Sequence, residues 1–537
     1  MQKLLANKYS LLLAFAILLL ISLNIIFVQG SLTPEYKFPI ILSSIGFSIF
    51  FVAVISVNRI FFTSFFIIVL FFGTLLAYFK FFFGIDFNES VLESIFNTDH
   101  EEASTFINYE LLLWMIAFWL IPTFVFIQKS NLLKIDFKKK IITSFLLSLV
   151  GAMVFYTPLL LIDKGNPVVF LQHASAINLY PANFMRTLRV YYKNVKFKEM
   201  NNIKINAFKD YKFEFNDTGV KIVLVLGESA RSDRFNNYKR NVIPNLAKIQ
   251  SLISFTNAYS LGTYTIVGLK NIFKLHPLEN ENTFISIFND LGFETSWISM
   301  QSFVHDINNI ASEAKKLITK EIIVQSNNYD VKDENLIPYL QQTLEDNKNK
   351  NQLIILHTQG SHRTYDDRYS EDFKKYTPTC STINETNILK RIFNRQSCYS
   401  AIEANNSYDN SILYTDYVLS KIIDELRSYK SMFIYISDHG ESLGENGIYL
   451  HSHKYKTAPK EQLHIPYILW FSEQLLDKNP NTKKKLEVAN SNASKKVDQS
   501  SVLHSILDCI DVKSDLIDKR KSICAVELNN DVIKTIL

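Results

Sequence analysis

Five long apolar runs in the first 165 residues limit what this chain can fold into more than any other feature. They cover residues 10–29, 37–58, 61–83, 110–128 and 141–163. Each run has about the length that an α-helix needs to cross the ~30 Å hydrocarbon core of a bilayer. A cleaved signal peptide is the alternative for the first run, but no small-residue cleavage site follows it. The runs therefore predict a transmembrane domain of five helices over residues 1–165.

The placement of Lys and Arg around these runs predicts their orientation. Lys3 and Lys8 precede the first run, Arg59 separates the second from the third, and five lysines lie in the link 129–140. The loop 84–109, on the other side, contains no Lys or Arg. Because basic residues stay in the cytoplasm, the N-terminus is expected there. An odd number of crossings then places everything after residue 165 outside the cytoplasm.

All four cysteines lie in the part of the chain that we expect to be exported. An even number of cysteines outside the cytoplasm suggests disulfide bonds. Pairing by nearness in the sequence gives Cys380 with Cys398 and Cys509 with Cys524. Two buried free thiols are the alternative for the second pair.

The segment 166–215 is a transition between two kinds of sequence. Its stretch NLYPANFMRTLRVYYKNVKF is amphipathic and rich in aromatic residues. A helix of this composition is suited to lying along a membrane surface, and an ordinary linker helix is the alternative. We expect an amphipathic linker over 166–215 and one exported domain over 216–537.

From residue 220 onward, β-type apolar runs alternate with helical stretches. The predicted strands are 221–229, 294–300, 321–325, 352–360, 432–440 and 466–472. The predicted helices include 282–291, 333–346, 405–428 and 500–508. Such alternation favours an α/β domain with a largely parallel central sheet and helices on both faces. Ligands of these sheets bind beyond the carboxyl ends of the strands.

Three of the predicted strands end in polar residues that suit a metal site. The first ends in LGES, which gives Glu228; the second ends in LHTQGSH, which gives His357 and His362; and the third ends in SDHGES, which gives Asp438 and His439. Carboxylates combined with histidine suit a divalent metal of intermediate softness such as zinc. Three strand ends of this kind in one domain predict a metal centre in the crevice that they share.

A possible nucleophile lies between the first and second of these strands. Gly262 allows a tight turn, and Thr263 and Thr265 then open a helical stretch. A hydroxyl at a helix N-terminus lies where free N–H groups stabilise an oxyanion, and a bound metal would lower its pKa. Spacing alone favours the simpler interpretation that one threonine is an N-cap.

Several motifs together resemble one known family. They are GESARSDRFNNYKR, GTYT, HTQGSH, YDNSILYTDYVL and SDHGESLGENGIYLH with the following APKEQLHIP. The resemblance is to the bacterial phosphoethanolamine transferases, which include the lipid A-modifying and polymyxin-resistance enzymes of the alkaline phosphatase/sulfatase superfamily. It covers nearly the whole chain, from the membrane helices to a periplasmic hydrolase-like domain, and implies a multi-pass protein of the bacterial inner membrane.

The resemblance also implies roles for particular residues. A Zn²⁺ ion would be held by Glu228, Thr265, Asp438 and His439. Thr265 would be the nucleophile that accepts phosphoethanolamine, and His362 and His451 would bind the substrate phosphate or a second zinc ion. The donor in this family is phosphatidylethanolamine, and diacylglycerol leaves.

Two further features come with the resemblance. The stretch SIFNTDHEEA is similar to the family segment that receives the ethanolamine group, with Ser94, Thr98 and Glu102 at the receiving positions. A carboxylate suits a cationic ammonium, although a solvated acidic loop is the alternative for Glu102. The pair Cys380–Cys398 matches a disulfide of the family.

The chain also departs from the family pattern. Leu261 and Asn271 stand where many relatives have a disulfide across the nucleophile helix. After the strand that contains Trp297, Met300 replaces an asparagine and the usual lysine is missing. Gln301 and His305 are the nearby polar residues that could substitute, so the donor pocket is expected to differ in detail.

The expected function is transfer of phosphoethanolamine to an envelope acceptor, such as lipid A, through a phosphoethanolamine-threonine intermediate at a zinc site. Alternatives are a phosphoglycerol transferase or another phosphodiester hydrolase of the superfamily, and a non-catalytic membrane scaffold. A sulfatase would need a Cys/Ser-x-Pro-x-Arg motif, which the stretch TYTIV lacks. A transporter would usually need charges inside the membrane helices, and almost none are present. The net charge of +5 is assigned to topology and solvated surface, with no nucleic-acid partner.

Overall fold

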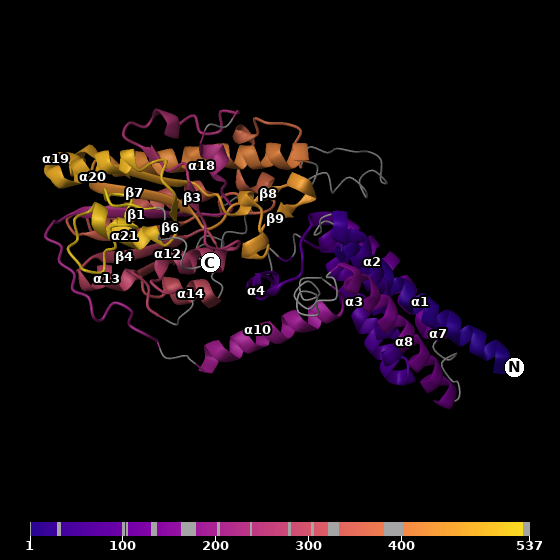
Figure 1. Cartoon of the computed structure of the whole chain (residues 1–537). Helices are drawn as coiled ribbons and strands as arrows, with labels where there is room; N and C mark the ends of the chain where they lie inside the picture. The colour runs from indigo at the N-terminus through magenta and orange to yellow at the C-terminus, as the bar shows by residue number, and fades with distance from the viewer. Residues whose placement is uncertain are drawn as a thin grey trace. The chain divides into compact units, whose positions relative to one another are not determined.

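The chain forms two compact units in the computed structural model shown in Figure 1. The first unit comprises residues within 1–92 and 102–194, and the second comprises residues within 93–101, 195–386 and 397–537. The structure describes residues 2–28, 34–98, 103, 106–129, 137–162, 179–200, 204–236, 239–277, 281–301, 305–319, 332–380 and 401–529.

The first unit contains the five predicted membrane-crossing helices. Helices long and apolar enough to span a bilayer cover Tyr9–Phe27, Phe38–Ile55, Ile60–Phe83, Tyr109–Lys129 and Phe137–Pro158. They belong to α1 (Gln2–Val28), α2 (Pro34–Ile55), α3 (Arg59–Phe83), the continuous series α6 (Tyr109–Met115), η1 (Ile116–Leu120) and α7 (Ile121–Lys129), and α8 (Phe137–Ile162). The prediction of five apolar helices is therefore confirmed.

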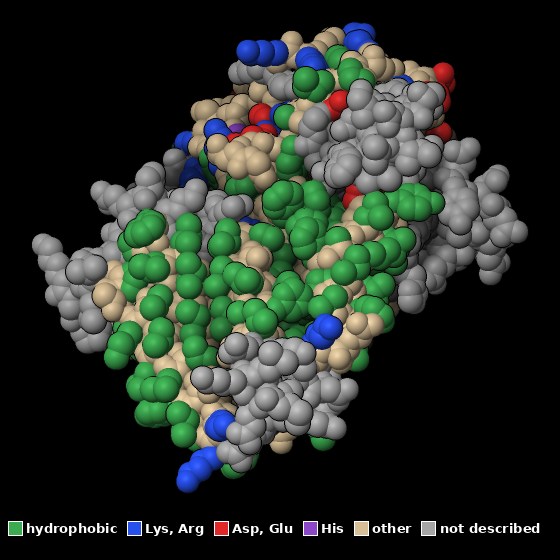
Figure 2. All heavy atoms as spheres, turned by 90° about the vertical axis from the view of Figure 1, so that its right-hand side faces the viewer, with side chains coloured by type: hydrophobic (Ala, Val, Ile, Leu, Met, Phe, Trp, Pro, Cys, Tyr) green, Lys and Arg blue, Asp and Glu red, His purple; other side chains and the backbone are tan. Residues whose placement is uncertain are grey.

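The outer surface of these helices is apolar. Large hydrophobic side chains such as Leu18, Ile68, Phe124 and Phe145 are exposed. Figure 2 shows a broad field of hydrophobic side chains with few charged groups among them. Contact of this apolar surface with lipid is favourable, whereas its contact with water would cost free energy.

Several polar side chains of the membrane helices, such as Asn24 and Ser48, lie inside the unit instead. The buried Asn24 of α1 donates from Nδ2 to the carbonyl of Tyr180 at 3.0 Å and to Ser48 Oγ at 3.3 Å. The N–H of Tyr180 donates back to Asn24 Oδ1 at 2.8 Å. This exchange satisfies backbone groups just before α10 (Ala182–Met200), the helix predicted within the linker.

The boundaries expected from the sequence, 1–165, 166–215 and 216–537, remain a prediction.

The second unit is built around a seven-stranded sheet. Its order is β2 (Ile253–Ser254), β10 (Tyr467–Phe471), β7 (Lys430–Ser437), β1 (Val220–Gly227), β6 (Gln352–His357), β4 (Glu294–Ser299) and β5 (Lys316–Thr319). The pairs from β7 to β5 are parallel, whereas β10 is antiparallel to both β7 and β2. The largely parallel sheet is confirmed. The predicted strand 321–325 lies outside the described residues.

Alternation along β1 explains why helices cover both faces of the sheet. Ile222 and Leu224 pack in one core, with residues of α12 (Thr265–Phe273), α13 (Ile285–Asp290) and α21 (Ser501–Cys509). Val223 and Val225 pack in the other, with residues of α16 (Leu336–Asp346) and α18 (Ala401–Leu426). Successive side chains of a strand point to opposite faces, so an unbroken apolar strand needs two covers. Figure 1 shows α18 on one side of the sheet and α12 and α13 on the other.

One of the two predicted cysteine pairs can be compared with the structure. Cys509 at the end of α21 forms a disulfide with Cys524. This outcome excludes the alternative of two buried free thiols for that pair. Cys398 lies outside the described residues, so its pairing with Cys380 stays a prediction.

Candidate active site

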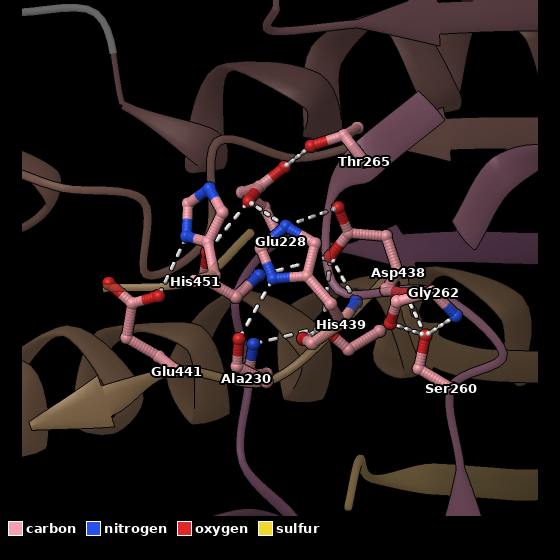
Figure 3. A network of polar contacts seen from close by, with 12 residues as sticks. Glu228, Ala230, Ser260, Gly262, Thr265, Asp438, His439, Glu441 and His451 are labelled. Atoms are coloured by element: carbon pink, nitrogen blue, oxygen red, sulfur yellow. Dashed lines mark hydrogen bonds and ion pairs between the residues drawn. The ribbon is translucent and has the colours of Figure 1, made fainter. Parts of the chain in front are cut away.

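The adjacent parallel strands β1 and β7 bring two carboxylates together. Their register pairs Gly227 with Ser437, the last residues of the two strands. The N–H of Asp438 donates to the carbonyl of Gly227 at 3.1 Å. Glu228 therefore follows its strand at the same edge of the sheet as Asp438, and His439 comes next (Figure 3).

Glu228, Asp438 and His439 form a compact, buried group with atoms suited to metal binding. His439 Nε2 lies 3.4 Å from Glu228 Oε1 and 3.2 Å from Asp438 Oδ2, and all three side chains are at most 1% exposed. Asp438 Oδ2 and His439 Nε2 nevertheless have no hydrogen-bond partner among the described residues. Buried polar atoms are rarely left without partners, so these residues fit a cation.

Neighbouring groups orient the ligand atoms toward one another. Asp438 Oδ1 accepts the backbone N–H groups of Ser229, at 3.1 Å, and His439, at 2.7 Å. His439 Nδ1 donates to the carbonyl of Gly440 at 2.8 Å. These bonds leave Asp438 Oδ2 and the lone pair of His439 Nε2 directed at the same point, as in metal sites whose ligands are held by outer partners.

The two carboxylates have opposite pKa shifts. Burial raises the pKa of Asp438 well above its usual range, and the charge of Glu228 raises it further. Burial also acts to raise the pKa of Glu228, but electrostatic interaction with the neighbouring imidazoles of His439, His362 and His451 outweighs this effect and leaves it below its usual range. Two adjacent buried carboxylates resist ionising together. A divalent cation would remove that conflict, which again favours a metal centre.

Thr265 lies at the start of α12 and contacts this group. Its Oγ1 donates to Glu228 Oε2 at 3.2 Å. Thr263 is buried and donates from Oγ1 to the carbonyl of His453 at 2.6 Å. Tyr264 is the N-cap residue, and no side chain caps this helix. The interpretation that one of the two threonines is the N-cap was therefore wrong, because Tyr264 occupies that position and the Thr263 hydroxyl is engaged with another loop.

His451 is oriented by a carboxylate that the sequence analysis did not identify. Its Nδ1 donates to Glu441 Oε2 at 2.8 Å, while Glu441 Oε1 accepts the hydroxyl of Tyr365 at 2.7 Å. The ring centroid of His451 lies 4.2 Å from that of His439 and 6.3 Å from that of His362. His451 thus lies beside His439, and His362 lies near His451; their expected role in binding phosphate or a second metal stays a prediction.

His439, Glu441 and His451 are also close enough together to hold a metal ion. Both oxygens of Glu441 already accept hydrogen bonds, and His439 Nε2 is directed at Glu228 and Asp438. We therefore assign Glu441 as the orienting partner of His451. Its position two residues after His439 was the available sequence signal.

The residues expected to receive ethanolamine are only partly described. Ser94 Oγ lies 3.0 Å from Ser452 Oγ, next to His451, and both serines belong to the second unit. Thr98 Oγ1 donates to the carbonyl of Ser94 at 2.7 Å. Glu102 lies outside the described residues.

Gln301 joins the site at the place where the family pattern is broken. Its Nε2 donates to Glu228 Oε2 at 3.1 Å and to the carbonyl of Thr358 at 2.8 Å. Both partners are acceptors, so they fix which end of the amide faces them. The side chain of His305 is not among the described atoms.

Helix α12 is connected to a neighbouring helix next to Asn271, one of the two positions where this chain departs from the family pattern. Lys270 of α12 forms a salt bridge of 2.8 Å with Asp306 of α14 (His305–Ala311). Asn271, at one of the two family cysteine positions, donates to the carbonyl of Val267 in its own helix.

A largely parallel sheet with a carboxylate–histidine group at its strand ends, facing a hydroxyl at a helix N-terminus, defines the alkaline phosphatase/sulfatase class. Residues 221–512, more than half of the chain, match the Sulfatase family. Residues 45–195 match the family described as phosphoethanolamine transferase EptA/EptB. The chain belongs to the bacterial phosphoethanolamine transferase family within this class.

Individual relatives agree with this assignment. The Kdo(2)-lipid A phosphoethanolamine 7''-transferase of Escherichia coli K12 is 26% identical over 468 residues, which are 81% of this chain and 80% of the relative. The integral membrane lipooligosaccharide phosphoethanolamine transferase A of Neisseria meningitidis shares the fold, with a TM-score of 0.77 over 95% of this chain and 97% of that chain at 24% identity. The periplasmic domain of EptC from Campylobacter jejuni is 30% identical, with a TM-score of 0.50 over 61% of this chain and 99% of that domain.

Proposed function

We propose that this enzyme transfers phosphoethanolamine from phosphatidylethanolamine to lipid A or another envelope acceptor through a covalent intermediate on Thr265. The observation that carries the proposal is the hydrogen bond of 3.2 Å from Thr265 Oγ1 to Glu228 Oε2, within the group that also contains Asp438 and His439. The names of the relatives supply the transferred group and the lipid A acceptor.

Glu228, Thr265, Asp438 and His439 would hold a zinc ion. The unpartnered, buried Asp438 Oδ2 and His439 Nε2 support this assignment. Zinc bound there would lower the pKa of the Thr265 hydroxyl and stabilise negative charge on the phosphate. Thr265 also lies at the N-terminus of α12, where free N–H groups favour an anion.

The first step exchanges one ester for another. Thr265 Oγ1 forms a bond to phosphorus, and the bond between phosphorus and the glycerol oxygen breaks. The proton that the Thr265 hydroxyl gives up balances the proton that diacylglycerol takes as it leaves. In the second step an acceptor oxygen attacks phosphorus, the bond to Thr265 breaks, and the hydroxyl is restored.

His451 is the group best placed to move these protons. Because Nδ1 donates to Glu441, the ring keeps Nε2 available for proton transfer or for contact with the phosphate. His362, whose ring lies near that of His451, would bind the substrate phosphate or a second zinc ion.

Ser94, Thr98 and Glu102 would receive the ethanolamine group of the donor. The Ser94–Ser452 contact supports this role because it brings the segment next to His451. The five membrane helices support a multi-pass inner-membrane protein. Its basic residues support a cytoplasmic N-terminus, with the second unit in the periplasm.

The covalent intermediate is the feature to test. The purified full-length protein would be incubated with vesicles that contain phosphatidylethanolamine, first without acceptor and then with lipid A. Mass spectrometry should find phosphoethanolamine on the peptide that contains Thr265, and the adduct should disappear when lipid A is added. A protein that modifies lipid A without forming any adduct would show direct, single-step transfer instead.

A further inference from the structure

The residue before the proposed nucleophile contacts a carboxylate far away in the sequence. Tyr264 is 8% exposed, and its hydroxyl donates to Glu93 Oε2 at 2.6 Å. Both residues belong to the second unit, although Glu93 lies within α4 (Glu89–Asn97), between two membrane helices of the sequence. A hydrogen bond to a carboxylate at this distance is short and charge-assisted.

Ser94, the next residue of the same segment, is connected through Ser452 to the turn 263–265, which we call the nucleophile turn. Ser94 Oγ lies 3.0 Å from Ser452 Oγ, and the N–H of Ser452 donates to the carbonyl of Thr263 at 2.8 Å. Ser452 has φ 68°, a conformation that is costly for a residue other than glycine. The surrounding contacts must hold it there. Consecutive residues 93 and 94 thus connect to Tyr264 and to Thr263, which immediately precede Thr265.

We infer that Glu93 and Tyr264 are positioning residues, and that residues 93–94 hold the turn 263–265 in the conformation that aims Thr265 Oγ1 at the donor phosphate. This inference rests on the proposed function. The described hydrogen bond of Tyr264 is to Glu93 rather than to a reacting atom, so Tyr264 is inferred to act through the backbone of the adjacent Thr265.

The backbone of Tyr264 explains how a contact at its hydroxyl can control Thr265. Tyr264 is extended, with φ −157° and ψ 157°, whereas Thr265 begins the helix. The direction of the Thr265 side chain therefore depends on how the peptide between these residues is oriented. The Tyr264 side chain makes no capping hydrogen bond to α12, and its hydroxyl is instead anchored outside the helix, at Glu93.

The same segment links donor binding to the nucleophile. Ser94 and Thr98 are proposed to receive the ethanolamine group, and Glu93 is the residue directly before Ser94. A donor held by this segment would find the nucleophile turn fixed by the same few residues. Loss of the Tyr264–Glu93 bond should then slow the chemical step more than it weakens donor binding, because the receiving residues remain.

The test compares variants that remove or keep the acceptor. Tyr264→Phe removes only the hydroxyl, Glu93→Ala removes the acceptor, and Glu93→Gln keeps an oxygen that can accept the bond. A matched control is Tyr429→Phe, because the Tyr429 hydroxyl also donates to a glutamate, Glu345, but precedes β7 at the opposite end of the strand from Asp438. Each full-length variant is assayed for zinc content, melting temperature, and the rate and donor dependence of adduct formation.

Tyr264→Phe and Glu93→Ala should each slow adduct formation at saturating donor by about 10-fold or more, the scale expected for a misplaced nucleophile. Zinc content and KM for the donor should stay near the wild-type values. The double variant should be no slower than either single variant, and Glu93→Gln should recover most of the rate. Tyr429→Phe should retain the wild-type rate.

Other outcomes overturn the inference in distinguishable ways. Full rates in Tyr264→Phe and Glu93→Ala would show that the contact does not position Thr265. If the slower rate is accompanied by a matching decrease in zinc content and by a lower melting temperature, the pair has a general structural role instead. A wild-type protein that forms no adduct would overturn the proposed intermediate and this inference together.

Discussion

Asp438 and His439 each have one buried atom that the described protein groups leave without a hydrogen bond. They are the first two residues after β7, and hydrogen bonds at Asp438 Oδ1 and His439 Nδ1 hold both side chains in place. A cation is the simplest partner that satisfies both atoms and also offsets the repulsion between Glu228 and Asp438. The site should therefore bind metal more firmly than a loose surface cluster would.

Asp438→Ala should abolish zinc binding, because it removes one ligand and leaves a void at the centre of the group. Metal analysis of the purified full-length protein should find zinc in the wild type and little in the variant. Asp424→Ala is the control, since this exposed carboxylate pairs only locally with Arg427. Equal zinc in wild type and Asp438→Ala, or none in the wild type, would contradict the assignment.

Thr265→Ala should abolish transfer, whereas Thr265→Ser should keep part of it, because the hydroxyl survives. Thr263→Ala should reduce stability by about 1 kcal/mol through loss of its hydrogen bond to His453, with transfer retained. Peptide mapping of the adduct and denaturant unfolding measure the two effects separately. An adduct on Thr263 would shift the nucleophile by two residues.

The sequence could predict Glu228, Asp438 and His439 because they are the first one or two residues after an apolar strand, and parallel strands end at one edge. Glu441 and Gln301 were harder to assign, since their roles depend on which way a side chain turns after the strand ends. The Tyr264–Glu93 contact spans 171 positions and two different kinds of sequence. Local sequence patterns do not predict a contact between residues so far apart in the sequence.

Helix α21 carries a histidine whose environment is set by packing. His504 is 4% exposed, and its Nδ1 accepts the N–H of Asp518 at 3.3 Å. Burial, followed by the charge of Lys521, lowers the pKa of His504 to about 4, against 6.5 when it is exposed, although Asp518 acts in the opposite direction. The folded protein thus keeps this ring neutral in a pH range where the unfolded chain protonates it.

This difference should make the second unit less stable as pH falls from about 6.5 to about 4. Between these values the unfolded state binds more protons than the folded state, so the free energy of unfolding decreases as the pH falls. The contribution of His504 is fully present above a pH of about 6.5. The difference from 6.5 to about 4 corresponds to about 3 kcal/mol. His504→Gln should flatten the pH dependence of denaturant unfolding, measured with chelator throughout to exclude metal loss. An unchanged slope would contradict this origin.

The positions of strands along the sequence were more predictable than their direction in the sheet and the strands with which they pair. The apolar runs that became β1, β4, β6, β7 and β10 were recognised with ends within a few residues of those observed. The antiparallel direction of β10 and the two-residue strand β2 were not predicted. Direction and edge pairing depend on how the chain crosses the sheet, which apolar periodicity does not encode.

At the scale of the whole molecule, the oxidation state of the cysteines reports on topology. All four should be in disulfides in growing cells, because the second unit is proposed to lie in the oxidising periplasm. Alkylation without reductant, followed by peptide mapping, should label none of them. Labelled Cys380 or Cys398 would argue against export of this unit, whereas labelled Cys509 or Cys524 would contradict the observed disulfide.

The strand order has a consequence for how the protein is made. β1 is the first strand of the sheet to be synthesised and lies at its centre, but its partners β6 and β7 begin at Gln352 and Lys430. If the chain crosses the membrane from N- to C-terminus, the centre of the sheet cannot close until most of the second unit has passed. Such distant pairing slows folding and exposes unpaired strands for longer. The same delay would keep the unit unfolded while it crosses the membrane, which a polypeptide that is exported before folding requires.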